Sequence, residues 1–356
     1  MTASPHSASV VLEGVSKRFG EVAAVDNIDL RIGAGSLVTL LGPSGCGKTT
    51  TLRMIAGLEA PTSGRIVIGD RDVTLLPPNE RDVSMVFQSY ALFPHMTVME
   101  NVAYGLQKSN LARAERLAKG RDGLKLVGLE GFERRRPSEL SGGQQQRVAV
   151  ARALVLEPKV LLFDEPLSNL DAKLRRRMRE EIRDLQLKLG LTSVYVTHDQ
   201  EEALAVSDTV VVMNKGIIAQ EGTPRDLYEK PANSFVADFV GGANLLPVRV
   251  EGRNAKGGVV VALGEERIRV ADTDFKGQSA FLVVRPNAVT LSASPTPGAI
   301  AARITKATYL GSHWEYSIEL EGQRLFITDT RRPIHEIATV VYAEFDPAVL
   351  VLIERY

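Results

Sequence analysis

A run of eight residues near the start of the chain has the composition and spacing of a phosphate-binding loop. It follows a predicted strand at residues 36–41 and precedes a predicted helix, which is the context that such a loop requires. Glycines let backbone N–H groups curl around an anion, and the helix N-terminus adds the positive end of its dipole. A glycine-rich turn without a ligand is the structural alternative, and the strand–turn–helix context argues against it. The residues are Gly42, Pro43, Ser44, Gly45, Cys46, Gly47, Lys48 and Thr49, followed directly by Thr50.

Two adjacent carboxylates, Asp164 and Glu165, end an apolar run that predicts a buried strand at residues 160–163. Because side chains alternate along a strand, the two acids point differently and can serve different tasks. Asp164 suits the coordination shell of Mg²⁺, to which Thr49 would offer its hydroxyl, while Lys48 would bridge the outer phosphates. Glu165 suits a general base that polarises an attacking water. The acid pair is weak evidence alone, and the phosphate loop strengthens it.

A histidine follows another predicted strand, at residues 193–197. His198 precedes Asp199, which predicts an N-cap for the helix that carries Glu201 and Glu202. An imidazole at the carboxyl end of a strand can reach the edge of a nucleotide site. A lone histidine is more often structural, and the position of His198 relative to the other motifs favours the functional interpretation.

A second potential anion site lies at Ser141, Gly142, Gly143 and Gln144. The serine and the glutamine three residues later form a capping-box pattern, and the two glycines expose N–H groups at a helix start. This site uses the same physical principle as the first, so one chain carries two half-sites for a phosphate tail. The structural alternative is an ordinary capped helix that runs to Glu157 and stops before Pro158.

The elements that must position these residues alternate between β-branched runs and helix-period segments from about residue 10 to 240. This pattern predicts an α/β fold with a mostly parallel sheet, including a further strand at 209–213 and an amphipathic helix at 173–190. After Gly241 and Gly242 the sequence changes to short alternating strands, which predicts a small antiparallel barrel. We therefore expect two domains, at residues 1–241 and 242–356.

Composition excludes several functional classes. The chain has 43 Lys+Arg and 43 Asp+Glu residues, a balance that argues against a general nucleic-acid binder. No apolar run approaches the roughly 20 residues of a membrane span, and the first ten residues lack the features of a signal peptide. Cys46 is the single cysteine, which excludes internal disulfides and agrees with a cytosolic location. A redox role for Cys46 is less favoured than simple occupancy of a loop position.

Together, the phosphate loop and the segment Leu140–Arg147 (LSGGQQQR) resemble the nucleotide-binding domain of the ABC family over about residues 10–240. The resemblance implies a P-loop NTPase of ABC type, with a helical signature subdomain, that binds ATP and Mg²⁺. It implies a homodimer in which Ser141, Gly142, Gly143 and Gln144 contact the ATP held by the opposite subunit. The same resemblance assigns further roles: adenine stacking to Phe19, sensing and metal contact to Gln88, dimer contact to the loop Ser168–Asp171 (including Asp171), and γ-phosphate switching to His198.

The C-terminal segment resembles the OB-like β-barrel domain of importer ATPases related to the maltose, polyamine, ferric iron, sulfate and phosphonate systems. The signals are Gly241–Asn244, Val284–Pro286 and Tyr309–Ser312. They imply a subunit at the cytoplasmic face of the inner membrane that drives a separate permease, supplied by a periplasmic or extracellular solute-binding protein. Ferric iron or a polyamine is the favoured solute. The apolar segment 88–96 predicts a permease-docking groove that includes Tyr90 and Phe93, with core packing as the alternative.

Three other functions compete with an importer ATPase. A soluble ABC machine acting on DNA or ribosomes conflicts with the balanced charge, the single cassette and the C-terminal domain. An exporter ATPase conflicts with that domain as well, and a plain P-loop kinase would lack the signature loop. Regulation by a small molecule bound to the C-terminal domain is one further possibility. An inert packing role is the alternative, because the sequence of that domain shows no evident cluster of ligand-binding residues.

Overall fold

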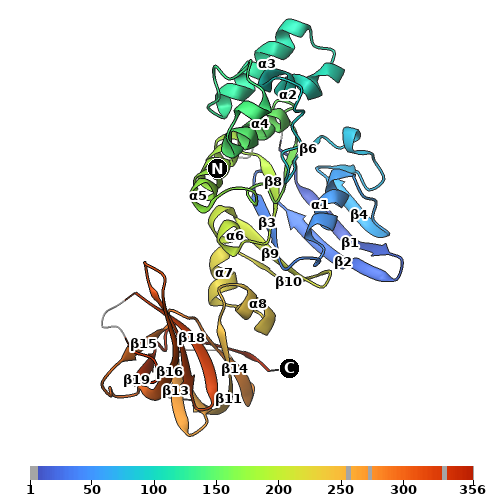
Figure 1. The fold of residues 1–356 in the computed structure, drawn as a ribbon. Helices are drawn as coiled ribbons and strands as arrows, with labels where there is room; N and C mark the ends of the chain where they lie inside the picture. Colours follow the sequence, from blue (N-terminus) through green and yellow to red (C-terminus); the bar gives the residue numbers. More distant parts are fainter. Residues whose placement is uncertain (1–6, 254–257, 272–274, 331–334, 356) are drawn as a thin grey trace. The chain divides into compact units, whose positions relative to one another are not determined.

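The computed structural model describes residues 7–253, 258–271, 275–330 and 335–355 (Figure 1). The expectation about a signal peptide rests partly on residues 1–6, which lie outside this set. The chain forms two compact units, Met1–Pro224 and Arg225–Tyr356, called here the N-terminal and C-terminal units. The contacts assign helices α7 (Pro224–Glu229) and α8 (Ser234–Phe239) largely to the C-terminal unit, whereas the boundary predicted at residue 242 placed them before it.

A six-stranded sheet organises the N-terminal unit. Its five neighbouring strands β9, β3, β8, β7 and β6 are parallel, and β10 adds an antiparallel edge. All residues of β3, β7 and β8 are buried, which explains why these strands read as continuous apolar or β-branched runs. The α/β fold expected from the sequence is confirmed. The strands are β3 (Leu37–Leu41), β6 (Val83–Val86), β7 (Val160–Asp164), β8 (Thr192–Thr197), β9 (Thr209–Asn214) and β10 (Ile217–Gly222).

A second, antiparallel sheet belongs to the same unit and has the order β2-β1-β4-β5. Its apolar face joins the core that surrounds the first helix after the phosphate loop, with Leu12, Leu30 and Ile66 nearly or fully buried. The strands are β1 (Val10–Phe19), β2 (Val22–Ile32), β4 (Ser63–Ile68) and β5 (Arg71–Asp72).

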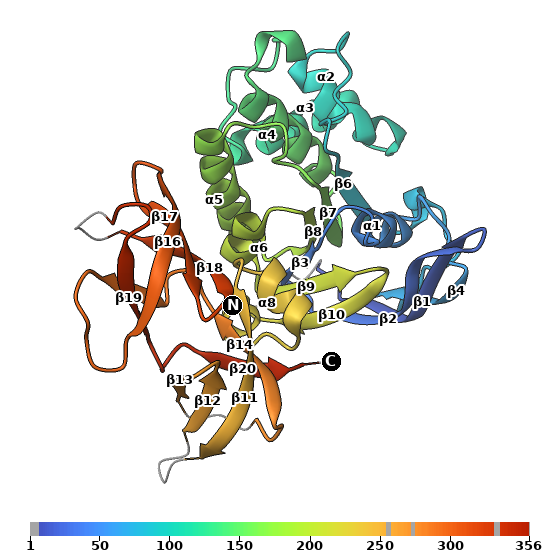
Figure 2. The same cartoon turned by 60° about the horizontal axis from the view of Figure 1, so that its bottom comes forward.

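Helices of the N-terminal unit fall into two groups. Figures 1 and 2 both show α2, α3 and α4 together at one end of this unit, away from α1, and they share a core of their own. On α5, Met178 and Ile182 are buried, as the period of its apolar residues predicts. Helix α4 ends at Leu154, three residues before Glu157, where the sequence placed the end of a capped helix. The helices are α1 (Lys48–Ala56), α2 (Val98–Ala103), α3 (Arg113–Leu126), α4 (Gly142–Leu154), α5 (Ala172–Leu189) and α6 (Gln200–Val206). Short 3₁₀ turns occupy Pro78–Glu80, Tyr104–Lys108 and Pro137–Glu139.

Two antiparallel five-stranded sheets build the C-terminal unit, in the orders β13-β12-β11-β14-β20 and β15-β19-β16-β17-β18 (Figure 2). They enclose one apolar core to which both contribute, so the OB-like β-domain expected from the sequence is confirmed. The strands are β11 (Asn244–Arg253), β12 (Val259–Leu263), β13 (Glu266–Val270), β14 (Ser279–Val284), β15 (Val289–Ser292), β16 (Ile300–Tyr309), β17 (Trp314–Leu320), β18 (Gln323–Asp329), β19 (Val340–Phe345) and β20 (Val351–Glu354).

Arg285 stabilises the C-terminal unit from inside. Its guanidinium donates to the carbonyl oxygens of Ala237, Val240 and Tyr228, and it lies over the Tyr228 ring. We expect Arg285→Met to lower the free energy of unfolding of this unit by about 3 kcal/mol, because buried carbonyls would lose their donor. Urea denaturation followed by tryptophan fluorescence measures this loss, and Arg324→Met on the exposed surface is the matched control. Equal midpoints for the two variants would contradict the assignment.

Candidate active site

The phosphate loop has a positive φ at Gly42, Gly45 and Gly47, and at two of these positions a side chain would also clash. Gly42 and Gly47 have φ values of 158° and 106°. A Cβ on Gly42 would lie 2.3 Å from the Met213 carbonyl oxygen, and a Cβ on Gly47 would lie 2.5 Å from that of Ala24. The loop therefore passes close to neighbouring backbone, which explains the glycines at these two places.

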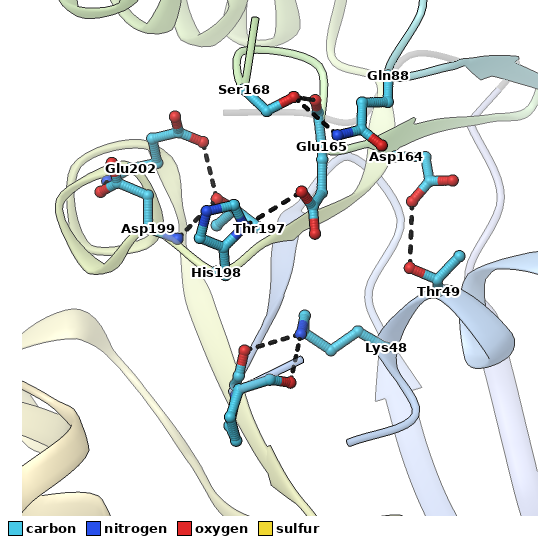
Figure 3. Close-up of polar contacts among 12 residues, drawn as sticks. Lys48, Thr49, Gln88, Asp164, Glu165, Ser168, Thr197, His198, Asp199 and Glu202 are labelled. Atoms are coloured by element: carbon cyan, nitrogen blue, oxygen red, sulfur yellow. Dashed lines mark hydrogen bonds and ion pairs between the residues drawn. The ribbon is translucent and has the colours of Figure 1, made fainter. Parts of the chain in front are cut away.

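Lys48 starts α1 and points back across the loop. Its ammonium group donates to the carbonyl oxygens of Gly42 at 2.7 Å and Pro43 at 2.9 Å (Figure 3). Cys46 is buried in the core of the N-terminal unit, with its sulfur 3.7 Å from the Lys48 nitrogen. The lysine charge thus lies against two backbone carbonyls of the phosphate loop, where it can also pair with an anion.

Asp164 lies at the carboxyl end of β7, opposite the start of α1. The hydroxyl of Thr49 donates to its carboxylate at 3.4 Å, so two residues 115 positions apart meet at one edge of the sheet (Figure 3). Burial raises the pKa of the Asp164 carboxyl, while the charge of Arg53 and the Thr49 hydroxyl oppose that rise. A cation placed at these two oxygens would favour the ionised carboxylate further.

Glu165 and His198 form a direct pair at the same edge. Glu165 Oε2 lies 3.1 Å from His198 Nδ1 (Figure 3). Glu165 has a φ of 44°, uncommon for a residue with a side chain, and its backbone N–H donates to the Val196 carbonyl of β8. The backbone therefore turns sharply at Glu165, which directs consecutive carboxylates to different neighbours. The sequence predicted that the two acids would point in different directions. The pairing of Glu165 with His198 follows from the sheet order, because the parallel neighbours β7 and β8 end beside each other.

Gln88 follows β6 and is tied to the loop that follows Glu165. Its side-chain amide donates to Ser168 Oγ at 3.1 Å, and the Asn169 amide donates to the Gln88 carbonyl at 2.9 Å. Ser168 Oγ in turn donates to the carbonyl of Glu165 at 3.1 Å. Figure 3 shows the Gln88 side chain pointing toward Ser168. Gln88 and Glu165 are therefore joined through one hydrogen-bonded loop.

The remaining predicted site residues lie apart from this cluster. Phe19 ends β1 with 51% of its surface exposed and with Lys17 over its ring. Ser141 caps α4, and it forms the capping box with Gln144 that the sequence predicts. Asp171 caps α5 by accepting from the Leu174 N–H at 2.9 Å. Within the described part of the chain, no hydrogen bond joins residues 141–144 to the phosphate loop.

Three residues near His198 were not predicted from the sequence to belong to the site. They are Arg175, Thr197 and Glu202, and the burial of Glu202 was also not expected. Glu202 accepts hydrogen bonds from Tyr195 and Thr197, and Arg175 contacts both Glu202 and Asp199. Charge on a helix is ordinarily solvated, so nothing in the sequence separated Arg175 from the arginines at 176 and 177. Only the packing of α5 against α6 shows that its side chain turns inward.

A recess with a volume of about 400 Å³ lies on the N-terminal unit, apart from these residues. Its apolar lining includes Phe93, Tyr104 and Leu156. Tyr90, which was expected to line this groove, is instead 94% buried and packs in a core cluster, so that expectation was wrong for this side chain. Arg152 donates to the carbonyl oxygens of Tyr90 and Ala91, which holds the segment against α4.

None of the described residues belongs to a helix long and apolar enough to span a membrane.

Comparison with known proteins places these features in a family. Residues 25–168 match the family model described as "ABC transporter", and residues 282–353 match the TOBE domain. The chain is 60% identical over 320 residues to the "Fe(3+) ions import ATP-binding protein" of Rhizobium etli, with 90% of each chain covered. It is 60% identical over 321 residues to that of Agrobacterium fabrum, again with 90% of each covered. It is 51% identical over 341 residues to that of Escherichia coli, with 95% of each covered.

Solved structures agree with the fold of the N-terminal unit. A dimeric ATP-binding cassette in a post-hydrolysis state bound to ADP and Pi is 35% identical, with a TM-score of 0.54, and covers 61% of this chain and 99% of its own. A dimeric bacterial ABC transporter cassette is 34% identical, with the same TM-score and coverage. The cluster of phosphate loop, acid pair and histidine, the two matched domains and these relatives lead to one conclusion: the chain belongs to the ATP-hydrolysing subunits of ABC importers.

Proposed function

We propose that two copies of this chain bind and hydrolyse ATP to drive ferric iron through a separate membrane permease. The observation that carries the catalytic part is the convergence of Lys48, Thr49, Asp164, Glu165 and His198 at one sheet edge. The relatives named as Fe(3+) import ATP-binding proteins support the choice of solute. The charge balance of the chain supports a role without nucleic acid.

In the proposed reaction, Glu165 takes a proton from the water that attacks the terminal phosphate. A carboxylate beside an imidazole 3.1 Å away is held in one orientation, as a general base requires. Lys48 and the loop N–H groups balance the charge of the phosphates, and His198, 59% exposed at the rim, would contact the γ-phosphate. Gln88, tied to Ser168, would report the state of the site to the loop around it.

Magnesium fits the oxygens that this edge presents. The Thr49 hydroxyl and the Asp164 carboxylate lie 3.4 Å apart and are hard donors of the kind Mg²⁺ prefers. Among the described residues, no group of three His, Cys, Asp or Glu side chains could hold a metal alone. We therefore infer that Thr49 and Asp164, with Gln88 nearby, would hold the ion together with nucleotide oxygens. The ion would supply charge neutralisation at the phosphates.

The proposed homodimer completes the nucleotide site. Ser141, Gly142, Gly143 and Gln144 lie at the start of α4 with the serine exposed, and the N–H groups of Ser141 and Gln144 are engaged in the capping box. The serine hydroxyl and the positive end of the helix dipole would then face a phosphate held by the second molecule. Phe19, exposed on its own strand, would stack on the adenine ring. The dimeric cassettes among the solved structures support this arrangement. Asp171 would lie at the dimer contact.

The apolar recess suits the cytoplasmic end of a permease. We expect Leu156→Glu to abolish co-purification of the chain with its permease, because a charge would enter an apolar contact. Leu75→Glu, an exposed leucine outside the recess, is the matched control and should retain the complex. Equal thermal midpoints of the two variants would exclude unfolding. Full recovery of the permease with Leu156→Glu would contradict docking at this recess.

Uptake measurements test the solute and the location. A strain lacking this chain should lose uptake of radioactive Fe³⁺ and regain it with the wild-type chain, while uptake of labelled putrescine should stay unchanged. Loss of putrescine uptake instead would assign the system to polyamines. In membrane fractions the chain should sediment with the permease at the cytoplasmic face of the inner membrane. A periplasmic or extracellular solute-binding protein would deliver the iron.

A further inference from the structure

Arg175 on α5 connects the two backbone segments that carry Glu165 and His198. Its Nη2 donates to the Leu170 carbonyl at 3.0 Å, and its Nη1 donates to Asp199 Oδ2 at 3.2 Å. Leu170 lies in the loop that begins at Glu165, and Asp199 follows His198 directly. One guanidinium group therefore clamps the loop after the acid to the turn after the histidine.

Glu202 on α6 forms an ion pair with this guanidinium group. The carboxylate is almost fully buried, and its Oε2 accepts from the hydroxyls of Tyr195 at 3.0 Å and Thr197 at 2.9 Å. Its Oε1 lies 3.7 Å from Arg175 Nε. A buried carboxylate with two donors has a fixed orientation, so its charge orients Arg175, whose buried Nε has no hydrogen-bond partner among the described residues.

These contacts close a ring that includes Glu165 and His198. From Glu165 the chain runs to Leu170, then through Arg175 to Asp199, back to His198 and across the 3.1 Å contact to Glu165. Figure 3 shows Thr197, Asp199 and Glu202 grouped near His198. Glu165, His198, Arg175 and Glu202 also line one small polar cavity of about 70 Å³. Because His198 is 59% exposed, its own packing restrains it little, and its neighbours must set its position.

Arg175 differs in this respect from the arginines beside it. Arg176 and Arg177 form i,i+4 ion pairs with Glu180 and Glu181 on the exposed face of α5. Such exposed pairs contribute little to the stability of a helix. Arg175 instead turns toward the site and is two-thirds covered. A role limited to helix stability does not account for a contact with the loop of Glu165.

We infer that Arg175, fixed by Glu202, is a positioning residue that keeps Glu165 and His198 in hydrogen-bonding register during ATP hydrolysis. This inference rests on the proposed roles of Glu165 and His198. A displacement of about 1 Å at a reacting group can lower a rate by about 10²-fold, so the loss of this clamp acts on turnover. The phosphate loop, with Lys48 and Thr49, lies outside the ring, so ATP affinity depends on it little.

The test compares Arg175→Met with Arg176→Met in the purified full-length chain. We expect Arg175→Met to lower kcat by about 10- to 100-fold with KM for ATP within about twofold of wild type, and Arg176→Met to match wild type. Arg175→Lys keeps the charge but cannot contact Leu170, Asp199 and Glu202 at the same time, so its kcat should lie between those of Arg175→Met and the wild type. Glu202→Gln, which keeps the shape of the side chain, should lower kcat in the same way.

A double-mutant cycle separates positioning from general stability. In a His198→Ala background, Arg175→Met should lower kcat little further, because one of the two groups that Arg175 holds in register is already gone. Independent, multiplied losses would overturn the inference, as would wild-type kcat in both Arg175→Met and Glu202→Gln. If Arg175→Met unfolds, Glu202→Gln in the same two backgrounds decides the question. Normal turnover in Glu165→Gln would instead refute the proposed role of Glu165 as general base, while an inactive Glu165→Gln with additive Arg175 losses refutes the positioning role alone.

Discussion

Glu165→Gln is expected to keep ATP binding and to lower the turnover number by about 10²-fold or more. The amide cannot accept the proton of the attacking water, while its size and its contact with His198 are nearly preserved. The phosphate loop is unchanged, so the binding of a fluorescent ATP analogue should match that of the wild type. Phosphate release under saturating ATP measures the loss.

The control for this variant is Glu180→Gln, an exposed acid on α5 that pairs with Arg176. It removes the same charge from the chain and should hydrolyse ATP at the wild-type rate. Wild-type turnover in Glu165→Gln would refute the role of Glu165 as general base and would make His198 the next candidate for that role. A simultaneous loss of ATP binding would show that Glu165 supports the nucleotide rather than the water.

Ser141→Arg is expected to bind ATP but to prevent nucleotide-dependent dimerisation, with hydrolysis reduced to background. Ser141 is exposed at the N-terminus of α4, where a long cation would occupy the space that a phosphate needs and would oppose the helix dipole. Sedimentation with ATP, in the Glu165→Gln background that retains the nucleotide, measures the dimer directly.

The matched variant is Ser141→Ala, which removes the helix cap without adding bulk or charge. It should cost about 1 kcal/mol of stability yet still allow the dimer, since the N–H groups of the helix start remain. Dimerisation of Ser141→Arg at the wild-type ATP concentration would refute the shared nucleotide site. Failure of both variants to dimerise would attribute the effect to the cap.

Much of the local site could be predicted from sequence because its chemistry is carried by short contiguous segments. The phosphate loop, the acid pair and the capped start of α4 each lie within eight residues, where backbone geometry and residue type are directly linked. The parallel sheet followed from continuous β-branched runs. Tyr90 shows the limit of this reasoning, since an apolar side chain beside a groove and one beneath it have the same sequence signal.

Contacts between distant segments were decided by the tertiary structure alone. Thr49 meets Asp164, and Glu165 meets His198, because β3, β8 and β7 are neighbours and parallel strands end at one edge. Arg175 and Glu202 meet because α5 packs against α6. By itself, therefore, the sequence determined which groups this protein possesses and the local shape of each loop. Their pairing required the strand order and helix packing, since those depend on burial summed over the whole chain rather than on any one segment.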